Sequence, residues 1–144
     1  MIDIPPEIQI TSTISPGSVY YFVEDTFNSD EPHYFIVINN KPLSDKVILL
    51  VCSSSQIQST IDRRKHLKGT LVIITTDQYE GFTRKSIVDC NEVHVKTIDQ
   101  IIFKLEKGEL KIKKEMDISI VEELRNAVCK SLLVDPDIID MLIE

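Results

Sequence analysis

The chain has 144 residues, 42% of them hydrophobic and 27% charged, and its formal net charge at pH 7 is −7. This composition is that of one globular domain with a sizeable core, and it excludes a low-complexity chain. There is no run of 18 apolar residues and no basic region leading into an apolar one, so we expect no transmembrane span, no signal peptide and a cytoplasmic location.

The charges are unevenly distributed along the chain. Residues 1–32 carry six acids and no Lys or Arg, and residues 115–144 carry eight acids against two basic residues. Residues 33–114 carry fourteen Lys or Arg against nine acids. The basic middle of the chain can therefore attract phosphate although the whole molecule is acidic.

The first 32 residues predict little regular structure. Pro5-Pro6 and the weak pattern around them predict an irregular arm over residues 1–13, with at most one edge strand. The apolar run Val19–Val23 predicts the first strand. The acidic stretch 24–32 is polar throughout, so we predict a mobile loop.

The next stretch predicts a β-hairpin with two buried strands. Two nearly continuous β-branched runs, 34–38 and 47–52, are joined by a turn that contains Pro, Ser and Asp. The chain from Ile57 to Lys68 fits one or two helical turns or a loop. Three further short strands are predicted at 71–75, 86–89 and 93–95.

From residue 97 onward the apolar period becomes helical. Thr97 and Gln100 have the spacing of a capping box, and the helix that they predict spans 98–107 and stops at Gly108. Ser119 and Glu122 repeat that spacing. The C-terminal elements predicted in this way are an edge strand at 110–112, a helix at 119–132 and a helix at 136–142.

This order of elements predicts an α+β domain, with a small, mostly antiparallel β-barrel and C-terminal helices. Within one domain of residues 1–144, we expect an arm over 1–13, the barrel over 14–96 and a mainly helical part over 97–144.

The hairpin also predicts the position of a site. In an antiparallel pair, the start of one strand lies near the end of its partner. His33 precedes the first strand and the hydroxyls of Ser53 and Ser54 follow the second, so we expect them at the same end of the sheet. The three cysteines are widely spaced and the three histidines lack metal-ligand spacing, so we expect free thiols, no metal site and no cofactor.

Several motifs resemble the MazF/PemK-like toxins of toxin–antitoxin systems. Pro16–Tyr20 resembles the opening strand of that family, His33–Ile38 its second strand, and Lys96–Asp99 the entry into its first C-terminal helix. The resemblance covers residues 16 to 133 and rests on the order and spacing of short motifs. It implies an SH3-like barrel that forms a homodimer, an RNA substrate and a cognate antitoxin protein as partner.

The resemblance also implies metal-independent cleavage of single-stranded RNA. His33 stands where the family has a catalytic arginine, and either Ser53 or Ser54 occupies the family's Thr/Ser position. A histidine can act as base or acid near neutral pH, so both positions remain candidates for catalysis. Four basic residues of the middle segment are candidates for RNA binding: Arg63, Arg64, Lys65 and Arg84.

Other interpretations of the same residues remain open. His33 also fits a surface or capping residue, the serines also fit turn formers, and the 63–65 cluster also fits a solvated face. For Tyr79 and Phe82 we favour anchoring of their loop over base stacking. Two other functions are a barrel that binds RNA or protein without cutting, since the catalytic arginine is absent, and a structural interaction protein.

Overall fold

The computed structural model describes residues 3–143 and is an α+β fold built on a seven-stranded sheet. All strand pairs are antiparallel and the sheet is barrel-like, as predicted. The strands are β1 Val19–Phe22, β2 His33–Val37, β3 Val47–Ser54, β4 Leu71–Ile74, β5 Ser86–Asp89, β6 His94–Thr97 and β7 Leu110–Lys113. The helices are α1 Pro6–Thr11, α2 Pro42–Asp45, α3 Ile57–Arg64, α4 Ile98–Glu106, α5 Ile118–Cys129 and α6 Pro136–Ile143.

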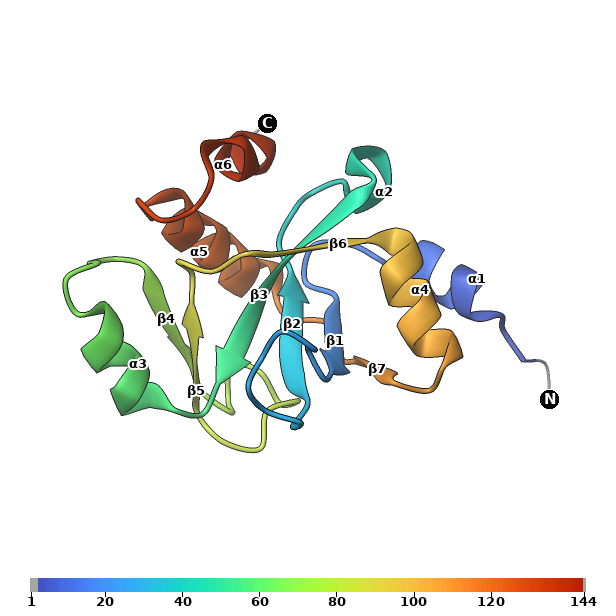
Figure 1. The fold of residues 1–144 in the computed structure, drawn as a ribbon, viewed down its shortest axis with the longest axis horizontal. Coiled ribbons are helices and arrows are strands. Elements are labelled where there is room, and N and C mark those ends of the chain that lie inside the picture. Colours follow the sequence, from blue (N-terminus) through green and yellow to red (C-terminus); the bar gives the residue numbers. More distant parts are fainter. Residues whose placement is uncertain (1–2, 144) are drawn as a thin grey trace.

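The long strand β3 holds the sheet together. One edge of β3 pairs with β2, which confirms the predicted hairpin. Its other edge is divided, because residues 47–50 pair with β6 and residues 53–54 pair with β5. The neighbours along the main path are β4-β5-β3-β2-β1-β7, and β6 pairs with β3 outside that path (Figure 1).

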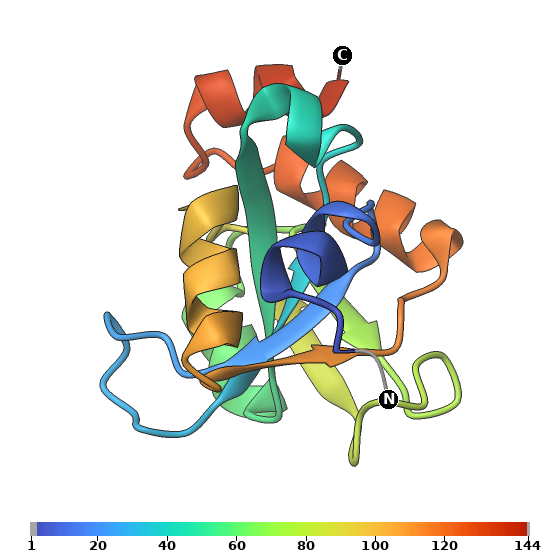
Figure 2. The same ribbon diagram turned by 90° about the vertical axis from the view of Figure 1, so that its right-hand side faces the viewer.

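Both faces of the central strands are buried, and this explains why their apolar runs are continuous. On one face, Ile36 and Val51 belong to a core that includes Leu124 of α5 and Leu142 of α6. On the other face, side chains of β1 to β3 pack with Ile10 of α1 and with α4. Figure 1 shows the two layers, with α5 and α6 on one side of the sheet and α1 and α4 on the other. The view in Figure 2 shows α1 next to α4.

The starts of two helices differ from the sequence predictions. Residues 1–13 were expected to be an irregular arm, but α1 forms there, because proline is well accommodated in the first turn of a helix, where its missing N–H costs nothing. Pro6 is the first residue of α1. The cap of α5 is Asp117 rather than Ser119, and its carboxylate accepts a hydrogen bond from the Ser119 backbone N–H at 2.9 Å.

The helices predicted over 98–107 and 136–142 are confirmed, whereas the helix predicted over 119–132 already ends at Cys129. Thr97 and Gln100 form a reciprocal capping box at the start of α4, and Gly108, with φ +73°, follows the end of that helix. The ambiguous stretch after β3 forms α3. Within residues 3–143, no helix combines the length and hydropathy needed to cross a membrane.

Candidate functional site

An open groove of about 710 Å³ lies at the end of the sheet where β2 begins and β3 ends. His33, Ser53, Ser54 and Arg84 all line it. The pairing Phe35↔Cys52, continued by two residues, places His33 opposite Ser54. His33 and the two serines therefore border the same groove at one end of the sheet.

His33 has one buried and one available ring nitrogen. Its Nδ1 is buried and has no hydrogen-bond partner among the described residues. The ring packs edge-on against Phe27, with 5.3 Å between ring centroids. His33 lines both the main groove and an adjoining pocket of about 240 Å³, so Nε2 is the nitrogen that remains for chemistry there.

The two serines differ in their hydrogen bonds. The Ser54 hydroxyl accepts a hydrogen bond from the Gln56 backbone N–H at 3.0 Å, so it helps to form the turn after β3 and keeps its proton for a ligand. Ser53 is 4% exposed and pairs with Val88 of β5. Both hydroxyls can donate to an oxygen atom in the groove, although Ser54 also has the turn-forming role.

The structure separates the four basic candidates. Arg84 is exposed in the main groove, and Arg63 lines the adjoining pocket. Arg64 lines neither, because it forms ion pairs with Asp89 at 2.8 Å and with Glu92 at 3.1 Å. Lys65 is exposed and lines neither the main groove nor the adjoining pocket.

Asp89 is the carboxylate that holds Arg64. Its side chain is 9% exposed, and it also accepts hydrogen bonds from the side-chain amide and backbone N–H of Asn91. Burial opposes ionisation, but the bonds from Arg64 and Asn91 outweigh burial and lower the pKa of Asp89. The Arg64–Asp89 pair therefore attaches α3 to β5, which is a structural role.

The acidic loop 24–32 is pinned at its beginning, whereas a mobile loop was predicted. Glu24 is buried, and the Lys96 ammonium lies 2.6 Å from its Oε1. Phe27 packs against His33 and also against His94, with ring centroids 5.4 Å apart. Beyond these anchors the loop reaches the groove, where Ser29, Glu31 and Pro32 form part of its wall.

His94 packs among aromatic side chains of the core. It contacts Phe27 and Phe35 and does not line the main groove. Burial lowers the pKa of His94, so the neutral ring is favoured at its position.

Among the groove residues that sequence reasoning did not identify are two tyrosines and a glutamate. Tyr21 and Tyr34 face each other across β1 and β2 with ring centroids 4.5 Å apart, and both line the groove, as does Glu31. Both tyrosines belong to predicted strands, but neither the pairing of those two strands nor their register follows from the sequence. Tyr79 is instead 3% exposed and donates its hydroxyl proton to the Lys114 carbonyl at 2.6 Å, so it anchors its loop as expected.

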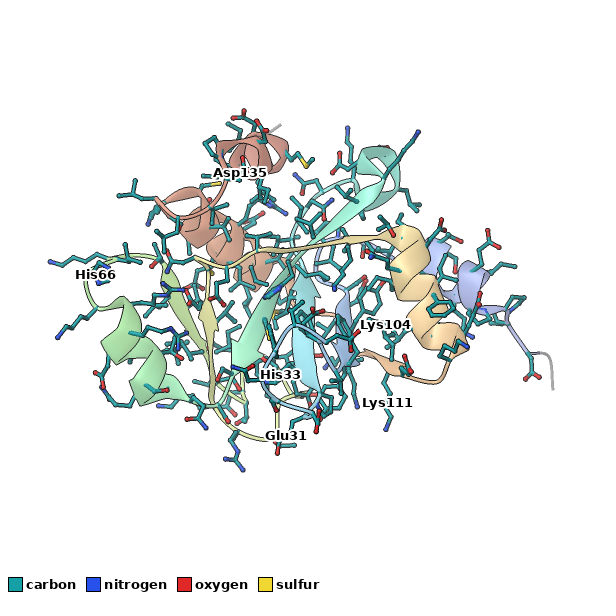
Figure 3. The ribbon with its side chains drawn as sticks, viewed as in Figure 1. Glu31, His33, His66, Lys104, Lys111 and Asp135 are labelled. Atoms are coloured by element: carbon teal, nitrogen blue, oxygen red, sulfur yellow. The ribbon has the colours of Figure 1, made fainter. Side chains whose placement is uncertain are left out.

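Figure 3 shows how the labelled residues are distributed. His33 and Glu31 lie close to each other at the lower end of the sheet, with Lys111 towards the same end. His66 and Asp135 lie well away from them. Among residues 3–143, no group of three or more His, Cys, Asp or Glu side chains is arranged to hold a metal ion.

Comparison with known proteins gives a likeness in fold. No protein-family model matches the chain, and no curated protein matches it in sequence. Among solved structures, the chain is similar to an endoribonuclease from a mycobacterial species, which was solved in complex with its cognate antitoxin. The TM-score is 0.53 at 12% sequence identity, and the match covers 85% of this chain and 98% of the other.

Proposed function

We propose that this protein is a MazF/PemK-like toxin, a metal-independent endoribonuclease that cleaves single-stranded RNA and is controlled by an antitoxin. The observation that carries the proposal is the convergence of His33, Ser53, Ser54 and Arg84 in one groove. The shared fold with an endoribonuclease that binds an antitoxin supports it. The motifs at Pro16–Tyr20 and Lys96–Asp99 point to the same family.

The proposed reaction is a transesterification within the RNA. The ribose 2′-oxygen attacks the adjacent phosphorus while the 5′-oxygen of the next nucleotide leaves, so the products are a 2′,3′-cyclic phosphate and a 5′-hydroxyl. Such a reaction needs a base for the 2′-OH, an acid for the leaving oxygen and stabilisation of the charged phosphorane.

The groove offers a base for the 2′-OH and groups that stabilise the charged phosphorane. His33 Nε2 takes the proton from the 2′-OH, and the serine hydroxyls donate hydrogen bonds to non-bridging oxygens. Arg84 reaches the groove from the loop before β5 and brings the positive charge that the family's arginine brings from position 33. The leaving 5′-oxygen takes its proton from water, which enters the open groove.

The direct test is a cleavage assay with a metal chelator. A long single-stranded RNA is incubated with purified protein in EDTA, and the cut ends are mapped and their chemistry is identified. We expect cyclic-phosphate and 5′-hydroxyl ends. We expect His33→Ala to lose cleavage by about 100-fold or more, because it removes the proton acceptor.

Matched variants make this assay specific. His66→Ala removes an exposed histidine that is distant from the groove, so it should cut as the wild type does. His33→Arg should retain part of the activity, since it restores the family's residue. Full activity in His33→Ala would contradict the mechanism.

A second function is favoured by one observation. The family's catalytic arginine is absent at position 33, and the exposed Glu31 places negative charge in the groove. A barrel that binds RNA or protein without cutting would show no cleavage in the assay, and His33→Ala would leave its binding intact.

A further inference from the structure

A row of side chains crosses four strands at the groove end of the sheet. Tyr21 of β1 pairs with Tyr34 of β2 on one side and with Lys111 of β7 on the other. Continued one residue beyond Phe35↔Cys52, the register brings Tyr34 level with Ser53 of β3, and both residues line the groove. Because directly paired residues share a face of a sheet, these four side chains form one line across the strands.

The middle of the row is aromatic and accessible. The rings of Tyr21 and Tyr34 are 4.5 Å apart at an angle of 42°, and both are half-buried in the wall of the groove. The other tyrosines, Tyr20 and Tyr79, are buried in the cores. An exposed aromatic wall of this kind can stack a nucleobase of any sequence.

The outer end of the row is positively charged. Lys111 is exposed, and Lys113 is half-buried with its ammonium 5.1 Å from the centroid of the Tyr21 ring. Neither ammonium forms an ion pair with a carboxylate of residues 3–143. Both therefore remain free to neutralise phosphate.

We propose that this row binds single-stranded RNA at right angles to the strands. One nucleobase stacks on the Tyr21–Tyr34 pair, the neighbouring phosphates contact Lys111 and Lys113, and the phosphate to be cut lies at Ser53. The proposal rests on the proposed function for the nature of the ligand. Three strand spacings separate β3 from β7, about 14 Å, which is the length of about four stacked nucleotides.

The order of the groups distinguishes this path from a nonspecific electrostatic attraction of RNA to basic side chains. The basic cluster of α3 lies on the opposite side of Ser53, and its Arg64 is occupied by Asp89 and Glu92. Along the row lie a hydroxyl, two rings and the cation of Lys111, with Lys113 two residues farther along β7. This order matches a phosphate, a base and further phosphates along one strand of RNA.

The test measures binding of an RNA that cannot be cut. A fluorescein-labelled, eight-nucleotide 2′-O-methyl RNA of mixed sequence is titrated with protein, and its anisotropy is followed from 50 to 300 mM salt. Tyr34→Leu, which keeps an apolar side chain and removes the ring, should weaken binding about tenfold without changing the salt slope. Lys111→Gln should reduce the slope of log K against log salt by about 0.7, the value for one phosphate contact with a single strand.

Two further measurements make the assay specific. Lys41 is exposed directly before α2, and Figure 1 shows α2 at the opposite end of the sheet from the start of β2. Lys41→Gln should therefore leave both affinity and slope unchanged. The chain has four tyrosines and no tryptophan, so tyrosine provides its intrinsic fluorescence. Stacking should quench this fluorescence in the wild type and much less in Tyr34→Leu.

The outcomes separate this inference from the proposed function. If the wild type cuts RNA while Tyr34→Leu and Lys111→Gln bind as the wild type does, the row is not the RNA path and only this inference fails. If the variants behave as expected and natural RNA stays uncut, the row is correct and the nuclease proposal fails. If an acidic peptide quenches the tyrosine fluorescence and the RNA does not, the row is not an RNA-binding site.

Discussion

At the scale of single residues, the groove depends on how Phe27 and Glu24 hold the start of the acidic loop. Phe27 fills the space between His33 and His94, and Glu24 faces Lys96 of β6. Through these contacts the polar loop rests on the Phe27 ring. They also hold the His33 ring in position, although no described residue forms a hydrogen bond with its Nδ1. The loop thus serves to orient the histidine as well as to border the groove.

The Glu24 carboxylate should make stability depend on pH. Burial alone would raise its pKa, but the ion pair with Lys96 and the hydrogen bonds from Thr26 outweigh burial and lower the pKa of Glu24 to about 2. The folded-state pKa lies below the unfolded one, so the unfolded chain binds the proton first. The stabilisation is complete above about pH 5 and is lost as the pH falls towards 2.

Glu24→Gln should therefore lower the free energy of unfolding at pH 7 by up to about 3 kcal/mol. Urea unfolding at pH 7 and at pH 2.5 measures the effect, and the difference from the wild type should shrink at the lower pH. Glu31→Gln, at the exposed tip of the same loop, is the matched control and should change stability little. An equal loss in Glu24→Gln at both pH values would contradict the assignment.

At the scale of elements, what the sequence predicts depends on how local the determining contacts are. The β2–β3 hairpin, α4 with its capping box and α6 after Asp135 all follow from short patterns, and the structure contains each of them. The residues of α1 were misjudged because Pro5-Pro6 suggested a break, although a proline at the first helical position is compatible with a helix.

The same limit applies to the candidate site, where only the positions that a local pattern determines could be predicted. His33, Ser53 and Ser54 were placed together because one hairpin determines their positions. The pairing of Arg64 with Asp89 and the facing of Tyr21 and Tyr34 depend on contacts between strands and helices that no local pattern specifies. For the same reason, the division of one edge of β3 between β5 and β6 was not foreseen.

Two glycines provide a test of how the elements are joined. Gly17 and Gly108 both have positive φ, at +101° and +73°. A Cβ at Gly108 would meet nothing within 4 Å, but one at Gly17 would lie 2.7 Å from the carbonyl oxygen of Met116. Gly17 also accepts a hydrogen bond from the Met116 N–H at 2.8 Å and so ties the start of β1 to the segment before α5.

We expect Gly108→Ala to cost about 1 kcal/mol, which is the backbone term alone. Gly17→Ala adds the clash with Met116 and should cost about 3 kcal/mol. Denaturant unfolding of the two variants measures the difference. Equal losses would show that the contact between β1 and the entry of α5 relaxes without cost.

At the scale of the whole molecule, acidic and basic side chains lie at opposite ends of the fold. The acidic C-terminal helices lie at the end of the fold opposite the groove, while Arg84 and Lys111 lie at the groove end (Figures 1 and 3). This arrangement reconciles a net charge of −7 with the phosphate binding that we propose for the groove.

We predict that the protein forms a symmetric homodimer, as the resemblance implies, with an interface of about 1,200–2,000 Å² in total. Light scattering at micromolar concentration should give twice the 16.5 kDa mass of one chain. A monomer across that range, with cleavage intact, would show that one groove is sufficient for activity.

The divided edge of β3 has a consequence for the order of folding. The β2–β3 hairpin closes a short loop, whereas β5 must return to Ser53 and Ser54 over more than thirty residues, and β7 must reach β1 over about ninety. His33 and the serines are therefore brought together early, but Arg84 and Lys111 arrive only with the late strands. We expect that a chain still emerging from the ribosome holds the histidine and the hydroxyls without the cations, so the candidate site is assembled only when synthesis is nearly complete.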